Sequence, residues 1–220
     1  MSLQYPLSLA SSSPRRRELL TFGGWTFSIA PADIDETPLP DEEPRAYVLR
    51  MAEEKAIAAR KTAVEPTIIL ASDTTVADGN MILGKPETPQ EATNMLTTLR
   101  NRVHQVHTAI AVTAPNSDEI ILDISSTDVP MRNYSDDEIA AYVASGDPFD
   151  KAGGYAIQNT DFYPVRTLTG CKASVMGLPV CHVVRAFAKV GLHPTQNVPA
   201  TCQAALTFDC NEYPKILDAD

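Results

Sequence analysis

The spacing of apolar residues predicts a strand, a helix and a second strand at the start of the chain. Residues 4–10 form a short apolar run typical of a buried strand. Ser13 and Pro14 follow as a helix N-cap and a first helical residue, and the Gly23-Gly24 pair ends this helix. Residues 25–30 alternate between apolar and polar side chains and predict the second strand.

A longer helix and the most buried strand come next. Pro44 opens a helical pattern that continues to about Arg60. Residues 67–71 form an apolar run typical of a strand covered on both faces, and we expect Asp73 to lie just past its end. The Asp78-Gly79 pair then predicts a hairpin turn.

The rest of the chain continues this alternation up to a less regular tail. Thr88 and Ser135 each begin a capping-box pattern, which predicts helices ending near Leu99 and at Gly146. Further strands and a last helix are predicted at residues 105–113, 119–125, 155–158 and 178–189. Residues 193–220 show no core-forming period and are expected to be an appended tail. Strands alternating with helices predict an α/β fold with antiparallel hairpins mixed in.

The composition argues against a nucleic-acid polymer as the partner. The 220 residues carry 28 acidic and 18 basic side chains, and the resulting net charge of −10 repels polyanions. No apolar stretch approaches the roughly 18 residues of a spanning helix, and the first residues lack the basic start of a signal peptide. The cysteines, which form no CxxC pair, are Cys171, Cys181, Cys202 and Cys210. We therefore expect a cytoplasmic protein with reduced thiols and no membrane partner.

Three arginines occupy a helical turn where cations are unfavourable. Arg15, Arg16 and Arg17 follow Pro14, and the positive end of the helix dipole costs about 0.3–1 kcal/mol for each. Exposed amide donors, the hydroxyls of residues 11–13 and the guanidinium groups can together bind a multiply charged anion such as phosphate. A solvated basic turn is the alternative. The position after a strand, where α/β sheets hold ligands, favours the anion site.

Lys55 and Asp73 place charges where the pattern predicts burial. Lys55 falls on the apolar stripe of its helix with Val48 and Met51, so its ammonium must reach solvent or meet an anion. The Asp73 carboxylate can hold a divalent metal or accept a proton from water, and Glu36 offers a second acidic group. An aspartate that caps the following turn is the structural alternative.

Other common catalytic patterns are missing from the sequence, which contains no P-loop, no GxGxxG and no HExxH. His104 and His107 enter a predicted strand and are expected to be structural. Cys171 and Cys181 are expected to be small core residues, because no fixed base can be placed beside them.

Several motifs, in order along the chain, closely resemble those of the Maf family of nucleoside triphosphate pyrophosphatases. They are LASSSPRRRELL at 9–20, DIDE at 33–36, KA at 55–56, SDTTV at 72–76, LGKP at 83–86, DKAGGYAIQ at 150–158 and GLP at 177–179. The match covers about residues 7–191, nearly the whole chain except the tail. One such motif would be weak, but this many in register identify the chain as a member of the family.

The resemblance implies a mixed α/β fold shared with inosine triphosphatases and Ham1 proteins. Its sheet is elongated and bent, with flanking helices and two lobes around a central cleft. The expected domain is residues 1–192, followed by the tail at 193–220. The implied reaction is hydrolysis of a nucleoside triphosphate, dTTP or UTP or a modified pyrimidine nucleotide, to the monophosphate and pyrophosphate with Mg²⁺ or Mn²⁺.

The resemblance also implies roles for individual residues. The catalytic base is matched by Asp73, and the metal ligands are matched by Glu36 and Asp73. The positions that bind the triphosphate are matched by Ser11, Arg16, Lys55, Lys85 and Lys151. The positions that select the base are matched by Arg15, Thr74 and Gln158. The chain departs from the more usual alanine, glycine and glycine at Ser72, Asn101 and Ala156.

Two functions remain open on the sequence. The first is a house-cleaning pyrophosphatase for pyrimidine triphosphates, and the second is a nucleotide-binding regulator of cell division with little catalysis. Asp73 and Glu36 favour the enzyme, because two acids beside a triphosphate weaken anion binding unless a metal intervenes. The sequence leaves the oligomeric state open, with a homodimer among the options.

Overall fold

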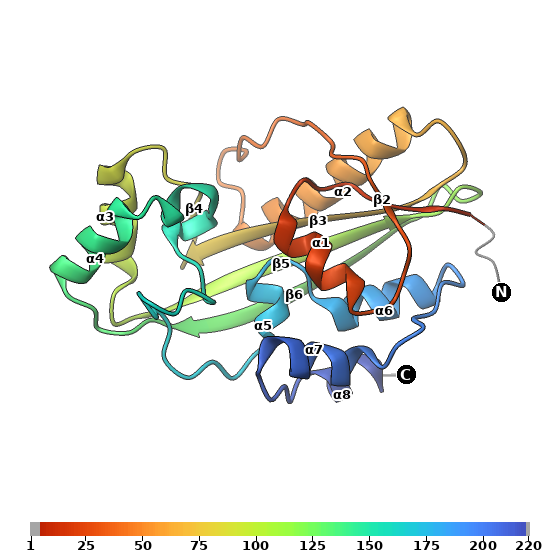
Figure 1. Cartoon of the computed structure of the whole chain (residues 1–220). Helices are drawn as coiled ribbons and strands as arrows, with labels where there is room; N and C mark the ends of the chain where they lie inside the picture. The colour runs from red at the N-terminus through yellow and green to blue at the C-terminus, as the bar shows by residue number, and fades with distance from the viewer. Residues whose placement is uncertain (1–4, 219–220) are drawn as a thin grey trace.

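The computed structural model describes residues 5–218, so Gln4 and residues 219–220, which belong to the predicted first strand and tail, lie outside it. Within residues 5–218, six strands form one sheet (Figure 1). They are β1 (Leu7–Leu9), β2 (Ser28–Ile29), β3 (Ile68–Asp78), β4 (Met81–Leu83), β5 (Val103–Thr113) and β6 (Ile120–Pro130). The order is β2-β1-β3-β5-β6, with β4 beside β3. β1 pairs in parallel with β2 and β3, whereas the other pairs are antiparallel. The predicted mixed α/β architecture is confirmed.

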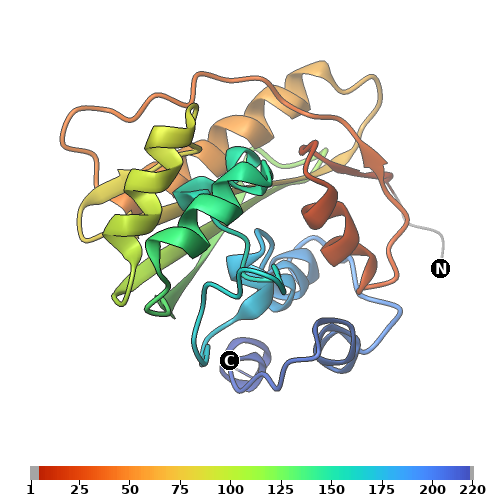
Figure 2. The same cartoon turned by 60° about the vertical axis from the view of Figure 1, so that its left-hand side comes forward.

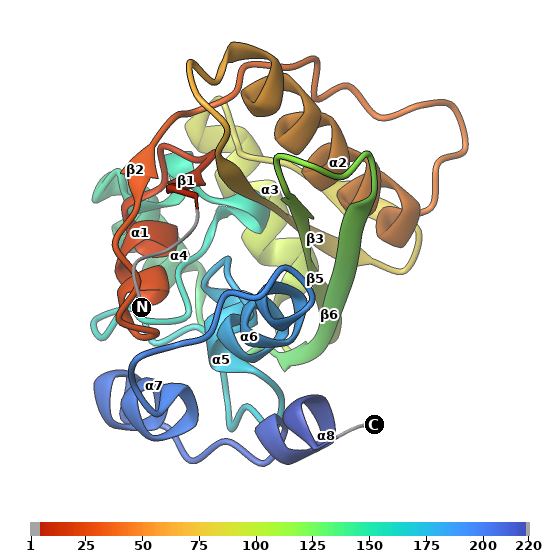
Figure 3. The same ribbon diagram turned by 90° about the vertical axis from the view of Figure 1, so that its right-hand side faces the viewer.

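Helices cover both faces of the sheet. They are α1 (Pro14–Thr21), α2 (Pro44–Thr62), α3 (Pro89–Leu99), α4 (Asp136–Ala144), α5 (Lys172–Val175), α6 (Val180–Ala188), α7 (Val198–Leu206) and α8 (Tyr213–Leu217), with short 3₁₀ turns η1 (Asp147–Asp150) and η2 (Ala152–Gly154). In the end-on view of Figure 3, α2 lies on one face, α5 and α6 lie on the other, and α7 and α8 lie outside them. Figure 2 shows α3 and α4 side by side at the other end of the molecule.

The helix starts follow the local sequence. The side chains of Ser13, Thr88 and Ser135 each accept a hydrogen bond from the N–H three residues further on. Ser135 and Glu138 complete the predicted capping box. The box predicted at Thr88 forms only its first half, because the Glu91 carboxylate accepts from a different N–H. Among residues 5–218, no helix is both long and apolar enough to cross a membrane.

β3 is longer than predicted, and this changes where Asp73 lies. The strand continues to Asp78 rather than ending near Ala71, and Asp73 sits in its middle, opposite Ala109 of β5. The β-branched residues 74–76 and the long partner β5 extend the pairing. The expectation that Asp73 follows the end of the strand is therefore wrong, and so is the alternative that it caps a turn.

Successive side chains of β3 point to opposite faces of the sheet, so residues at odd and even positions pack against different neighbours. Ile69 and Ala71 pack against the apolar stripe of α2, which is rich in alanine. Ile68 and Leu70 belong to the cluster formed with α1 and α6. Val76 joins a third cluster that includes residues of α3 and α4. Asp73 shares the face of Ile69 and Ala71, so the strand directs it toward α2.

Residues 155–158 form no strand, contrary to prediction. The N–H of Ala156 donates to the Tyr142 hydroxyl at 3.1 Å instead of pairing with a neighbouring strand. The Tyr155 hydroxyl lies 2.8 Å from Nε2 of the buried His104, and Nδ1 of His107 lies 2.9 Å from the Ser126 hydroxyl. These contacts agree with a structural role for both histidines. The other strand limits also move, since β2 covers only two residues of 25–30 and β6 continues beyond 125 to Pro130.

The tail folds as α7 and α8, so α6 is not the last helix. Val198 and Ile216 are buried in the same cluster as α6. The tail is also tied down at its start, where Thr195 N donates to Gly23 O at 2.9 Å and Trp25 Nε1 donates to His193 O at 3.1 Å. The tail therefore contributes to the core although its sequence shows no core-forming period. Each tail helix buries a single side chain, which is too few to produce a readable period.

Ending the chain at Pro194 is expected to lower stability but to spare the chemistry. Losing Val198 and Ile216 removes burial worth about 3 kcal/mol or more, which corresponds to a Tm lower by about 6–12 °C. Turnover per folded molecule should stay within about threefold, because all residues with implied roles end at Gln158. Thermal unfolding and a turnover assay on the truncated chain test both parts. An unchanged Tm, or a hundredfold loss of turnover in a folded truncation, would contradict this expectation.

Candidate active site

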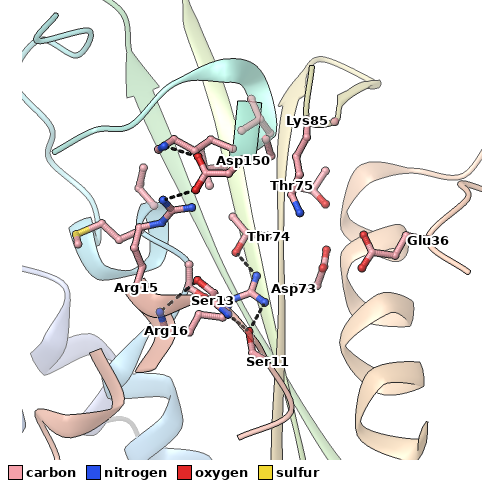
Figure 4. Close-up of a pocket in the computed structure, with 18 of the residues that line it drawn as sticks. Ser11, Ser13, Arg15, Arg16, Glu36, Asp73, Thr74, Thr75, Lys85 and Asp150 are labelled. Atoms are coloured by element: carbon pink, nitrogen blue, oxygen red, sulfur yellow. Dashed lines mark hydrogen bonds and ion pairs between the residues drawn. The ribbon is translucent and has the colours of Figure 1, made fainter. Parts of the chain in front are cut away.

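A cavity of about 750 Å³ lies beside the middle of β3 (Figure 4). Its walls come from the β1–α1 turn, the loop before α2, β3 itself, the loop after β4 and two segments at 150–158 and 175–177. All ten residues given roles by the family resemblance line it: Ser11, Arg15, Arg16, Glu36, Lys55, Asp73, Thr74, Lys85, Lys151 and Gln158. Neither His104 nor His107 is among the lining residues.

Lys55 lies between two carboxylates. Its ammonium is 2.7 Å from Glu36 Oε1 and 2.7 Å from Asp73 Oδ1. Lys55 and Asp73 are 8% and 7% exposed, so this pair is shielded from solvent on its inner side. The buried stripe of α2 and the odd face of β3 meet here, which brings the two charges together. The alternative that Lys55 reaches solvent along its helix is wrong.

Glu36 is held in its ionised form. Burial is the largest influence and acts to raise the pKa of this carboxyl. The hydrogen bond and charge of Lys55, with smaller effects from Lys85 and Arg16, outweigh burial and bring the pKa below its ordinary value. Glu36 is therefore a carboxylate at neutral pH.

Arg16 is fixed by acceptors of the chain itself. Its Nε donates to Gly177 O at 2.9 Å, Nη1 donates to Ser72 O at 2.7 Å and Nη2 donates to Thr74 Oγ1 at 3.2 Å. Nη1 also reaches Ser11 Oγ at 3.3 Å. Burial lowers the pKa of Arg16, and a nearby carboxylate acts in the other direction. A guanidinium stays protonated in proteins, so the pocket floor carries a prepositioned cation. The solvated-turn alternative is wrong for this residue.

The wall that carries Lys151 is rich in ion pairs. Arg15 Nη1 lies 3.5 Å from Asp150 Oδ2, on the side of the pocket away from Glu36 (Figure 4). The Lys151 ammonium donates to Asp147 O at 2.6 Å and to Asp147 Oδ1 at 2.9 Å, and it also contacts Asp150. The Lys151 ammonium thus donates its hydrogen bonds to acceptors of its own loop. Its role toward a phosphate remains a prediction.

The other predicted residues surround the same space. Lys85 follows β4, is exposed, and points into the pocket toward Thr75 and Asp73 (Figure 4). Thr74 Oγ1 accepts from Arg16 and lies 3.1 Å from the Thr108 hydroxyl. Gln158 lies in the loop after η2, is exposed and lines the same cavity.

Two residues that shape the site, Tyr47 and Gly177, were given no role by sequence reasoning, although Gly177 belongs to one of the family motifs. The Tyr47 hydroxyl donates to Glu36 O at 2.8 Å and so holds the loop that carries Glu36. Tyr47 is two helical turns before Lys55 on the same stripe, a spacing that could have revealed it. Gly177 has φ of 113°, a conformation that favours glycine, and its carbonyl accepts from both Arg16 and the Ser72 hydroxyl.

The donor set fits a divalent ion that arrives with phosphates. Among residues 5–218, no three His, Cys, Asp or Glu side chains gather into a metal site of their own. Glu36 and Asp73 nevertheless meet at one ammonium, which shows that both reach the same cation. Mg²⁺ is commonly held by one or two carboxylates together with substrate phosphates. Two carboxylates beside a pocket for polyphosphate match that pattern.

Comparison with known proteins identifies the family. A sequence profile described as Maf-like protein matches residues 6–190. The chain belongs to the Maf family. Among its Maf relatives, a dTTP/UTP pyrophosphatase of Geobacter sp. (strain M21) is 44% identical over 183 residues, which span 83% of this chain and 94% of the relative. A dTTP/UTP pyrophosphatase of Thermomicrobium roseum is 42% identical over 205 residues, 90% of this chain and 91% of the relative.

Similarity to solved structures is weaker. A Ham1 protein of Staphylococcus aureus gives a TM-score of 0.41 at 16% identity, covering 58% of this chain and 72% of the other. A nucleoside-triphosphatase (dITP/XTP pyrophosphatase) of Mycobacterium abscessus gives 0.40 at 12% identity, covering 84% and 94%.

Proposed function

We propose that this Maf protein hydrolyses nucleoside triphosphates to the monophosphate and pyrophosphate, with dTTP and UTP preferred. The observation that carries the proposal is the pocket in which Asp73 and Glu36 meet Lys55, with Arg16 and Lys85 nearby. The Geobacter and Thermomicrobium relatives, matched over more than nine-tenths of their length, support this substrate class. The proposal includes Mg²⁺ or Mn²⁺ as the metal and the cytoplasm as the location.

The cations bind and orient the triphosphate. Arg16 is rigid, so it presents a fixed positive charge to the phosphates without a loss of side-chain freedom on binding. Lys85 is exposed at the pocket, so its long side chain can reach the chain of phosphates. The Ser11 hydroxyl, next to Arg16, adds a donor at the same end. Together these groups neutralise the negative charge that would otherwise repel an attacking water.

Asp73 acts as the base. Its Oδ1 is held by Lys55, which leaves Oδ2 to accept a proton from water as the water oxygen forms its bond to phosphorus. The P–O bond that links the α- and β-phosphates breaks, and pyrophosphate leaves. A divalent ion held by Glu36 and Asp73 would supply Lewis-acid stabilisation of the developing negative charge.

The same geometry favours an enzyme over a nucleotide-binding regulator of cell division. A binder gains nothing from two carboxylates beside a polyanion, because each repels the phosphates. Here Asp73 is buried and Glu36 is kept ionised at the pocket wall. Incubation of the purified protein with single nucleotides, with pyrophosphate and orthophosphate measured separately, tests the proposal. Tight nucleotide binding without release of pyrophosphate would leave only the regulator.

Gln158→Ala is expected to narrow the preference for UTP over GTP. A glutamine amide can both donate to and accept from a uracil edge, and each unpaired polar group at a buried edge costs about 1–3 kcal/mol. We expect kcat/KM for UTP to fall by about tenfold and that for GTP by less than threefold. Gln90→Ala on the exposed face of α3 is the matched control. An equal fall in kcat/KM for dTTP, UTP, CTP, ATP and GTP would show that Gln158 does not select the base.

A further inference from the structure

The four cysteines converge on one small cavity that is separate from the active site. The cavity has a volume of about 20 Å³ and is lined by all four, together with neighbours that include Pro199 and Tyr213. Cys171 precedes α5, Cys181 lies on α6, Cys202 lies on α7 and Cys210 lies between α7 and α8. We name this cavity with its four cysteines the thiol pocket.

The thiol pocket lies at the junction between the Maf domain and the tail. Cys171 and Cys181 fall within residues 6–190, the range that matches the family, whereas Cys202 and Cys210 fall beyond it. A hydrogen bond crosses the junction beside these thiols, and another orders the tail around Cys210. The Lys172 ammonium donates to Leu206 O at 3.0 Å, and Cys210 N donates to Gln203 Oε1 at 2.9 Å. Each side of the junction therefore contributes two thiols to one space.

All four cysteines are free thiols in this structure. Burial, with smaller effects from the neighbouring thiols, raises the pKa of Cys171 and Cys181 to about 12 and that of Cys202 to about 11. Only a small fraction of these three thiols is thiolate at neutral pH, so their oxidation is slow there and faster at higher pH. Cys171, Cys202 and Cys210 are only half-buried, which leaves the pocket open to a small oxidant.

We propose that the thiol pocket is an oxidative modification site, in which a hydroperoxide joins Cys171 of the domain to Cys210 of the tail as a disulfide. This pair is favoured over the others because neither residue lies within a helix. A disulfide needs Cα atoms about 4.4–6.8 Å apart, and loop backbone adjusts to that more readily than helical backbone.

The chemistry balances with hydrogen peroxide as the oxidant. One cysteine, as thiolate, attacks a peroxide oxygen, the O–O bond breaks, and a sulfenic acid and hydroxide form. The second sulfur attacks the sulfenic sulfur, the S–S bond forms, and the sulfenic oxygen leaves as water with the proton of the second thiol. In total, two thiols and one peroxide give one disulfide and two waters. Each sulfur is oxidised by one electron, and the peroxide is reduced by two.

The disulfide would link the tail covalently to the domain. It closes a loop that runs from residue 171 to residue 210 and contains α5, α6 and α7, which restricts the unfolded chain and stabilises the folded one. α5 connects the thiol pocket to the active site, since Cys171 caps its first turn and Val175, Met176 and Gly177 line the larger cavity. Oxidation therefore secures one wall of the active site, and a thiol reductant releases it.

Peroxide treatment of the full chain followed by peptide mapping without reductant tests the proposal. We expect a Cys171–Cys210 cross-link that forms at least about tenfold faster at pH 9 than at pH 7 because the thiolate fraction rises, and a Tm higher by about 5–10 °C that dithiothreitol reverses. Cys171→Ser and Cys210→Ser should each abolish the cross-link and the rise in Tm. Cys181→Ser, which replaces the most buried thiol, should keep both.

Several results would overturn the proposal. They are the absence of any cross-link between residues 171 and 210, cross-links only between separate chains, and a rise in Tm that persists in Cys210→Ser. Zinc bound in a one-to-one ratio by the untreated chain, and lost in every cysteine variant, would instead make the pocket a metal site. The Tm of each variant in the reduced state shows that it is folded, so a missing cross-link is informative.

Discussion

Replacement of Asp73 with asparagine is expected to lower kcat by about 10²–10⁴-fold, the range for loss of a general base. The amide has nearly the same shape, but it cannot accept a proton from water and is a weaker metal ligand. Nucleotide affinity should survive, because Arg16, Lys55 and Lys85 still face the phosphates. Steady-state turnover of dTTP and UTP, with nucleotide binding measured separately, checks both halves of this expectation.

Asp78→Asn provides the matched control for that variant. Asp78 lies on the same strand and also pairs with a cation, Arg102 at 2.9 Å, but it does not line the cavity. Its substitution should leave turnover within about twofold. Turnover of Asp73→Asn equal to that of the wild type would remove Asp73 from the role of base.

Lys55→Met is expected to damage both stability and turnover. The substitution leaves the buried Asp73 carboxylate without the cation 2.7 Å away, and an unpaired buried charge costs up to about 3–5 kcal/mol. Methionine keeps most of the volume and the fit to the α2 stripe, so the loss reports the charge rather than a cavity. We expect kcat/KM to fall by about 10²-fold or more, because both orientation of the base and binding of phosphate are affected. Thermal unfolding and steady-state kinetics provide the measurements.

The pH dependence of this variant separates electrostatics from packing. Lys55 helps to hold the Glu36 pKa below its ordinary value, so the stability linked to Glu36 is present above that ordinary value and is lost as pH falls through the lowered one. Without Lys55 the Glu36 pKa rises, and the acidic limb of the activity profile should move to higher pH. Lys61→Met, at an exposed position of the same helix, should shift neither the profile nor the Tm. An unmoved acidic limb in Lys55→Met would contradict the pairing.

Helix starts and candidate chemistry could be predicted from local sequence. Ser13, Thr88 and Ser135 cap helices through bonds that span three residues, and such short-range interactions depend little on the rest of the chain. Asn101 adopts φ of 58°, which agrees with its occupying a position where the family has glycine. The residues with implied roles were also chosen from the sequence alone, and all of them line one cavity.

Long-range pairing decided what the sequence misplaced. β5 extends β3 beyond Ala71, and this pairing turns Asp73 from an expected end-of-strand residue into a mid-strand one. Residues 155–158 look like a strand by composition, but Tyr155 inserts toward His104 and the Tyr142 hydroxyl takes the backbone N–H of Ala156. The competing partners lie far away in sequence, so local propensity could not reveal them.

The sequence by itself determined the family, the helix caps and the residue types needed for phosphate chemistry, because each depends on local order along the chain. Only the tertiary structure decided that Lys55 bridges Asp73 and Glu36, and that Arg16 is held by Ser72 and Gly177. It also decided that the tail cysteines meet those of the domain. These contacts join segments separated by many residues, and their existence depends on how α2, β3 and the tail pack rather than on any pattern within one of them.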